Sequence, residues 1–174
     1  MNNILIVVDM QNDFVDGALG TPEALAIVPH VCAKIRAFQG NIFVTMDTHD
    51  AGYLQTREGR FLPVAHCIKG TPGWALNTDV AHALEDKSAA IVEKPTFGAV
   101  DLPQRIAAIG TPDSIELIGL CTDICVVSNA LLLKAHFPQT DILVDAACCA
   151  GVTPQAHKSA LDTMQSCQIE VLHP

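Results

Sequence analysis

Three short polar segments of this sequence combine residue types that could form a nucleophilic active site. Asp9 ends the apolar run 4–8, Lys94 follows the apolar run 89–92, and Cys125 lies in the segment 119–126, directly after the apolar run 114–118. A thiol becomes a strong nucleophile when a neighbouring base accepts its proton, and a lysine ammonium beside it lowers its pKa from about 8.5. An acid, a lysine and a cysteine at the ends of apolar runs therefore indicate covalent catalysis.

Each of these residues also has a structural explanation when it is considered alone. A carboxylate such as Asp9 can cap a neighbouring loop, a lysine such as Lys94 can extend its ammonium into solvent, and free cysteines are often buried packing residues. Cys121 and Cys125 are separated by three residues, one more than in a C-x-x-C redox motif, and no second cysteine pair completes a zinc site. A thiol redox protein that uses Cys121 and Cys125 remains an alternative.

The elements that must position these residues alternate as in a parallel α/β protein. The apolar, β-branched runs predict strands at residues 4–8, 42–46, 89–92, 114–118, 141–144 and 169–172. Helices are predicted at residues 29–38, 79–85, 102–109, 123–136 and 154–165. We expect one domain over residues 1–174, with a three-layer, doubly wound, mainly parallel six-stranded sheet and helices on both faces. In such sheets, ligands bind at the carboxyl ends of the strands.

Local signals refine this prediction. Pro29 and Pro154 are expected in the first turns of their helices, with Thr153 as an N-cap, and Gly110 is expected to end the helix before it. The segment 49–73 is predicted to be a long irregular connection, and such loops usually have a functional role.

Composition restricts the classes of function. The 174 residues carry a net charge of −9 without a run of Lys or Arg, which disfavours nucleic acids and anionic membranes as partners. The N-terminal apolar run lacks a basic flank and is predicted to be a strand, not a signal peptide, and no apolar run has transmembrane length. Seven scattered cysteines indicate a reduced, cytoplasmic setting, and a charged fraction of only 17% suggests a homo-oligomer.

The segments D-M-Q-N-D-F, K-P-T-F-G and G-L-C-T-D-I-C-V, in this order, resemble the isochorismatase-like cysteine hydrolases over the whole chain. Nicotinamidases, N-carbamoylsarcosine amidohydrolase and isochorismatase are known members of that family. The resemblance implies a catalytic triad of Asp9, Lys94 and Cys125, in which the Cys125 thiolate attacks a carbonyl and forms a thioester. It also implies a cis peptide bond between Leu120 and Cys121, which directs the N–H groups of Cys121 and Cys125 toward the substrate oxygen.

The long connection carries candidate metal ligands, and carboxylates with imidazoles can bind Zn, Mn or Fe. These ligands are Asp47, His49, Glu58 and His66. By resemblance, Asp47, His49 and His66 match the metal ligands of nicotinamidases, and Glu58 matches an extra carboxylate of some members. The chain departs from the nicotinamidase pattern at D-T-H, where those enzymes have D-W-H, and it lacks their serine after the lysine.

These features favour a cysteine-dependent amidohydrolase that cleaves the C–N bond of a small amide without an organic cofactor. Phe14, Trp74 and Phe97 are expected to form walls for a small planar substrate. The alternatives are an isochorismatase-type or carbamoyl/ureido hydrolase of the same family, or a non-catalytic member that binds a small ligand. Family members commonly form dimers and tetramers, which agrees with the expected homo-oligomer.

Overall fold

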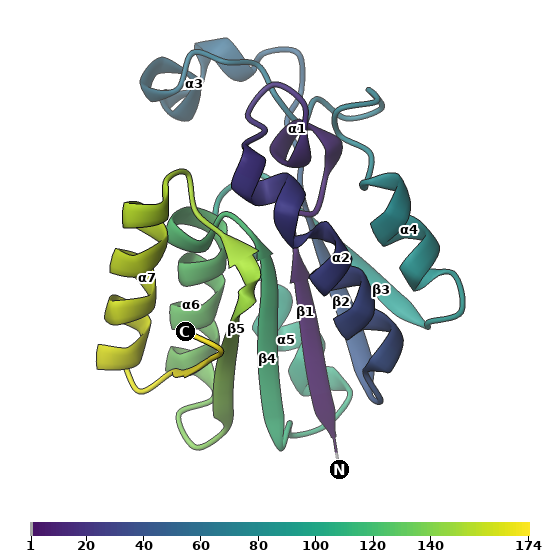
Figure 1. The fold of residues 1–174 in the computed structure, drawn as a ribbon, viewed down its shortest axis with the longest axis vertical. Helices are drawn as coiled ribbons and strands as arrows, with labels where there is room; N and C mark the ends of the chain where they lie inside the picture. The colour runs from purple at the N-terminus through teal and green to yellow at the C-terminus, as the bar shows by residue number, and fades with distance from the viewer. Residues whose placement is uncertain (1) are drawn as a thin grey trace.

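A six-stranded parallel sheet forms the centre of the structure, a computed structural model that describes residues 2–174 (Figure 1). Its strands are β1 (Asn3–Val8), β2 (Asn41–Asp47), β3 (Ala89–Lys94), β4 (Ser114–Leu120), β5 (Asp141–Ala150) and β6 (Glu170–Leu172). Their order is β3-β2-β1-β4-β5-β6, and every neighbouring pair is parallel. The predicted doubly wound sheet is confirmed. The strand order reverses between β1 and β4, which is where a crevice for ligands forms in such sheets.

Helices cover both faces of the sheet. Helices α2 (Pro22–Ala37) and α4 (Thr78–Leu84) lie on one face, and α5 (Leu102–Ala108), α6 (Val127–His136) and α7 (Pro154–Ser166) lie on the other (Figure 1). Successive side chains of a strand point to opposite faces, so alternate residues of β1 enter two separate cores. Ile4 and Ile6 pack under α5–α7, whereas Leu5 and Val7 pack under α2 and α4. This double burial explains why β1 is continuously apolar.

The start of α2 differs from the prediction. The helix begins at Pro22, seven residues before Pro29, and Pro29 lies inside it. The Thr21 hydroxyl accepts a hydrogen bond from the Ala24 N–H at 3.0 Å, and Pro22 at the first helical position is already set to helical φ. The prediction for α7 is confirmed, because it begins at Pro154 and Thr153 caps it through the Ala156 N–H.

The long connection is more structured than expected. It contains the 3₁₀ turn η1 (Tyr53–Gln55) and the short helix α3 (Arg57–Phe61), which lies above the carboxyl ends of the strands at the top of Figure 1. A further short helix, α1 (Asn12–Val15), directly follows the first strand end and was not predicted. Strand β5 also continues to Ala150, six residues past its predicted end. Among residues 2–174, no helix is long and apolar enough to cross a membrane.

Candidate active site

The register of the sheet brings the predicted catalytic acid and lysine to one edge. Val8, the last residue of β1, lies opposite Thr45 of β2, and Asp47 at the end of β2 lies opposite Lys94 at the end of β3. Asp9 follows β1 directly and adopts the left-handed conformation, with φ of +48°. Asp9 and Lys94, which are 85 positions apart in the sequence, thus converge because parallel strands end at the same edge.

Lys94 lies at the centre of this group. Its side chain is 1% exposed, and its Nζ atom lies 2.7 Å from Asp9 Oδ2, 3.3 Å from Asp47 Oδ1 and 3.5 Å from Cys125 Sγ. The Thr96 carbonyl accepts a further hydrogen bond from Nζ at 3.1 Å. The two carboxylates raise the pKa of Lys94 despite its burial, so it remains an ammonium. One buried cation therefore links the acid, the thiol and a candidate metal ligand.

The environment of Asp9 suits a proton acceptor. It is fully buried, and its Oδ1 atom accepts a hydrogen bond from the Thr45 hydroxyl at 2.6 Å. Burial raises the pKa of the Asp9 carboxyl, and the charge of Lys94 opposes this effect. A raised pKa makes the carboxylate a better proton acceptor. Thr45 was not predicted as part of the site, and nothing distinguishes it in the sequence from any other strand threonine.

Cys125 lies in the π-helical turn η2 (Thr122–Val126), which leads into α6. Burial and the charge of the Asp9 carboxylate raise the pKa of Cys125 well above its ordinary value, and Lys94 opposes them. Lys94 lowers the thiol pKa as expected, but desolvation outweighs the effect of one ammonium. Burial also raises the pKa of Cys121 to about 12.

The turn before Cys125 has a special backbone. The peptide bond between Leu120 and Cys121 is cis, at the position that the resemblance implies, and Gly119 has φ of +117°. A side chain at Gly119 would overlap the Val8 carbonyl oxygen of the neighbouring strand.

The fully buried Asn129 of α6 donates a hydrogen bond to the Cys125 carbonyl at 2.8 Å. Sequence reasoning missed Asn129, although an amide four residues after a candidate nucleophile in an apolar helix was a usable signal.

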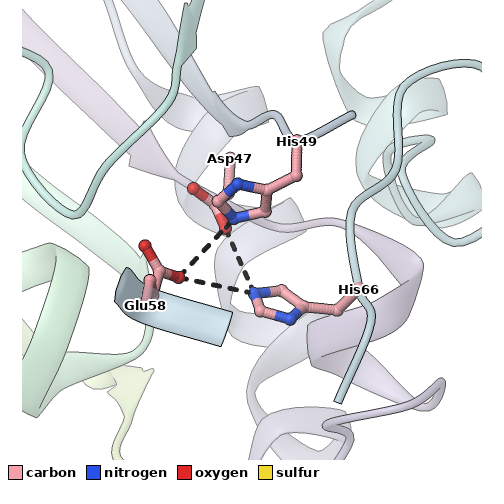
Figure 2. Close-up of side chains that lie close together, drawn as sticks. All are labelled: Asp47, His49, Glu58 and His66. Atoms are coloured by element: carbon pink, nitrogen blue, oxygen red, sulfur yellow. Dashed lines mark hydrogen bonds and ion pairs between the residues drawn. The ribbon is translucent and has the colours of Figure 1, made fainter. Parts of the chain in front are cut away.

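The four candidate metal ligands lie together beside the triad, and Figure 2 shows their side chains pointing toward one another. Their ligand atoms all lie within 4.8 Å of one another. Asp47 Oδ2 lies 2.9 Å from His49 Nε2 and 3.4 Å from His66 Nε2, while Glu58 Oε1 lies 3.6 Å from His49 Nε2. Burial alone would raise the pKa of Asp47, but the two imidazoles and Lys94 lower it. Two carboxylates and two imidazoles around one point are a donor set that fits a divalent transition metal.

Two residues of the D-M-Q-N-D-F segment support this cluster. The buried Gln11 amide accepts from the Asp47 N–H at 2.7 Å and donates to the Asp47 carbonyl at 2.9 Å. Asp13 accepts from the Cys67 N–H at 2.8 Å, next to His66. No role was predicted for either residue, although both are polar residues that follow a buried strand.

A cavity of about 350 Å³ opens onto both groups. Cys125, Cys121, Asp47, Glu58 and His66 line it, and most of its remaining wall is apolar, including Phe14, Leu19, Phe61, Leu62, Phe97 and Ile124. The structure thus places Phe14 and Phe97 at the cavity. It does not place Trp74 there: the indole N–H donates to the Thr48 hydroxyl, and the Trp74 carbonyl accepts from Gln11. These two hydrogen bonds hold Trp74 away from the cavity.

Comparison with known proteins identifies the class that this fold and site define. Residues 3–173 match the model of the isochorismatase domain, so the chain belongs to the isochorismatase family. It is 29% identical to the nicotinamidase/pyrazinamidase of Mycobacterium tuberculosis, with 97% of each chain covered. The structure of the nicotinamidase/pyrazinamidase from Bacillus subtilis superposes with a TM-score of 0.87 at 28% identity, covering 99% of this chain and 100% of that one. These relatives place the chain among hydrolases of amide C–N bonds.

A second solved structure bears on the metal cluster. The pyrazinamidase of Pyrococcus horikoshii in complex with zinc is 29% identical, with a TM-score of 0.85 and 99% of each chain covered. That relative binds zinc, and the cluster of Asp47, His49, Glu58 and His66 in the present chain offers a donor set suited to such an ion.

Proposed function

We propose that this protein hydrolyses a small, uncharged heteroaromatic carboxamide of the nicotinamide or pyrazinamide type, with Cys125 as nucleophile. The observation that carries this proposal is the cavity wall. Among the described residues that line it, none is a lysine or arginine, and the carboxylates of Asp47 and Glu58 face it. Lys94 is held by Asp9 and Asp47. A substrate carboxylate would find no lysine or arginine partner on this wall, which disfavours isochorismate, carbamoyl amino acids and ureido acids.

Lys94 Nζ contacts both Asp9 and Cys125, which brings the acid and the thiol close together and supports a proton transfer from the thiol to Asp9 before attack. Asp9 accepts the Cys125 proton, and Lys94 stabilises the negative charge that results on the sulfur 3.5 Å away. The thiolate attacks the amide carbonyl carbon, and the N–H groups of Cys121 and Cys125 bind the oxygen of the tetrahedral intermediate. Asp9 then returns the proton to the leaving nitrogen, which departs as ammonia and leaves a thioester.

The second half of the reaction uses the same base. Asp9 accepts a proton from water, and the resulting hydroxide attacks the thioester carbonyl. The C–S bond breaks, the carboxylic acid leaves, and the proton returns to the Cys125 sulfur. The raised pKa of Asp9 suits both steps, because a carboxylate of ordinary pKa would be a weak base at neutral pH.

Asp47, His49, Glu58 and His66 would hold a divalent metal such as Zn, Mn or Fe beside the triad. When bound, this ion would supply a Lewis acid for a lone pair of the substrate ring and so orient the carboxamide toward Cys125. The apolar walls at Phe14 and Phe97 would then enclose the ring and exclude water.

We further propose that the chain forms one domain, works in the cytoplasm and associates with copies of itself. All seven cysteines are free thiols. Phe61 and Val100 are 78% and 68% exposed, although both are large and apolar. Light scattering coupled to size-exclusion chromatography should give a mass above that of one 18.5 kDa chain; a monomer at all concentrations would contradict self-association.

An ammonia-release assay tests the catalytic proposal. The protein should act on nicotinamide and pyrazinamide but not on carbamoyl or ureido acids, Cys125→Ala should abolish the activity, and Cys121→Ala should keep most of it. Turnover of the charged compounds alone would favour the carbamoyl or ureido alternative, and no turnover with a fully loaded metal site would favour a ligand-binding member. Elemental analysis of a His49→Ala/His66→Ala variant tests the metal; unchanged metal content would exclude the cluster.

A further inference from the structure

Two hydrogen bonds outside the reacting groups connect the turn that carries Cys125 to the start of α7. The Thr122 hydroxyl lies 2.7 Å from His157 Nδ1, and the Asp123 carboxylate accepts from the Val152 N–H at 2.9 Å. The partners are 35 and 29 residues apart in the sequence. Thr122 is fully buried and directly follows Cys121, whose N–H belongs to the proposed oxyanion site.

The backbone of His157 is fixed by helix α7. It lies in the first turn of α7, where its N–H donates to the Thr153 carbonyl at 2.9 Å. Its ring, together with His30, lines a second cavity of about 410 Å³ between α2 and α7. Burial lowers the pKa of His157, and the nearby Asp123 opposes this only in part. The imidazole is therefore neutral near neutral pH and can form a hydrogen bond with a hydroxyl without an unpaired buried charge.

The 151–157 loop also packs directly against the turn that carries Cys125. A Cβ atom at Gly151 would lie 2.7 Å from the backbone nitrogen of His157 and 2.8 Å from Asp123 Oδ1. Any other residue at position 151 would therefore displace the loop or the turn. Val152, the next residue, lines the substrate cavity. The position of the Cys125 turn is thus coupled to the position of the 151–157 loop.

We propose that His157 is a positioning residue for the nucleophile, which acts by fixing the Thr122 hydroxyl and hence the turn from Cys121 to Cys125. It touches neither the sulfur nor the substrate cavity. A small displacement of a nucleophile can cost up to about a hundredfold in rate, because attack requires a near-ideal distance and direction. The inference rests on the proposed function only in taking Cys125 as the nucleophile.

The test begins with three histidine variants. His157→Ala removes the hydrogen bond, and His157→Asn keeps a polar atom close to the position of Nδ1. His30→Ala is the matched control, since His30 lines the same second cavity without a hydrogen bond to the Cys125 turn. Each is assayed for kcat and KM with nicotinamide, for the rate of Cys125 alkylation by iodoacetamide, and for thermal stability.

His157→Ala should lower kcat by about tenfold with KM changed by less than about twofold, and should slow the alkylation of Cys125. His157→Asn should recover most of both rates, and His30→Ala should match the wild type. Thr122→Val should reproduce the effect of His157→Ala, and the double variant should be no worse than either single one. Wild-type rates in folded His157→Ala, or no recovery in His157→Asn, would overturn the proposal.

The alkylation assay distinguishes a failure of the proposed function from a failure of the positioning role of His157. If the wild type releases no ammonia from any amide, the proposed function fails, yet the effect of His157 on the reactivity of Cys125 is still measured. If the wild type is active and His157→Ala loses rate only in proportion to unfolded protein, the positioning role fails while the function stands.

Discussion

Lys94→Met should strongly destabilise the protein as well as inactivate it. Lys94 is 1% exposed and lies 2.7 Å from the fully buried Asp9 carboxylate, so the substitution leaves a buried charge without its partner. Removing one partner of such a pair costs about 3–5 kcal/mol. For a chain of this size, each kcal/mol lowers Tm by about 2–4 °C, which predicts a fall in Tm of roughly 6–20 °C.

Two companion variants isolate the cause. Lys69→Met is the matched control, because Lys69 pairs with Glu93 at the surface, where both side chains are more than a third exposed. Such surface pairs contribute about 0–1 kcal/mol, so its Tm should change little. Asp9→Asn combined with Lys94→Met removes both charges of this pair. It should restore at least half of the lost stability, since Asp9 then carries no unpaired charge and Asp47 keeps its contacts with His49 and His66.

Urea and thermal denaturation, followed by circular dichroism after dialysis against EDTA, would measure these effects without a contribution from bound metal. A loss of less than about 1 kcal/mol in Lys94→Met, or a double variant as unstable as the sum of its single variants, would refute the view that Lys94 and Asp9 form a buried charge pair.

Three further predictions follow from other parts of the site. Gly119→Ala should give little folded protein, because the added Cβ overlaps a backbone oxygen of β1. Gly70→Ala is the control, since Gly70 also has a positive φ but has open space around it, and this variant should fold. Equal yields of the two variants would contradict the prediction. Gln11→Ala should leave the buried N–H and carbonyl of Asp47 without their hydrogen-bond partners and should lower the free energy of unfolding by about 2–4 kcal/mol. It should also reduce the metal content measured by elemental analysis, and full metal content would exclude an anchoring role for Gln11. Burial lowers the pKa of His157 in the folded state. The contribution of His157 to the free energy of unfolding is therefore complete above the unfolded pKa of 6.5 and is lost as the pH falls below that value. His157→Asn should thus flatten the dependence of stability on pH between about pH 7 and pH 5. An unchanged slope in urea denaturation across that range would contradict the shift.

The strand ends were predictable from the sequence because their signals are local. A β-branched apolar run that stops at a polar residue identifies a buried strand and its end, and this was sufficient to place Asp9, Asp47 and Lys94 at one edge of the sheet. Capping signals were equally local at Thr153, which begins α7 as expected. The error at Pro29 arose from the same kind of signal, since Thr21 and Pro22 form a stronger start earlier in the chain.

The contacts across elements were not predictable in this way. The sequence contains no mark of the hydrogen bonds that hold Trp74 away from the cavity, or of the pairing between Thr122 and His157. Each depends on where two distant segments meet after the core has packed. Long side chains such as Trp74 have several possible directions, and the partner that is within reach decides among them.

The amino-acid sequence by itself determined which chemical groups the strand ends carry: an acid, a lysine, a thiol and a set of metal ligands. Only the tertiary structure decided the state of those groups. The fold removes the thiol of Cys125 from water and places the Asp9 carboxylate beside it, and these effects raise the pKa of the thiol although the ammonium of Lys94 opposes them. Residue types are properties of the chain, whereas desolvation and charge pairing arise from distances that exist only in the folded protein.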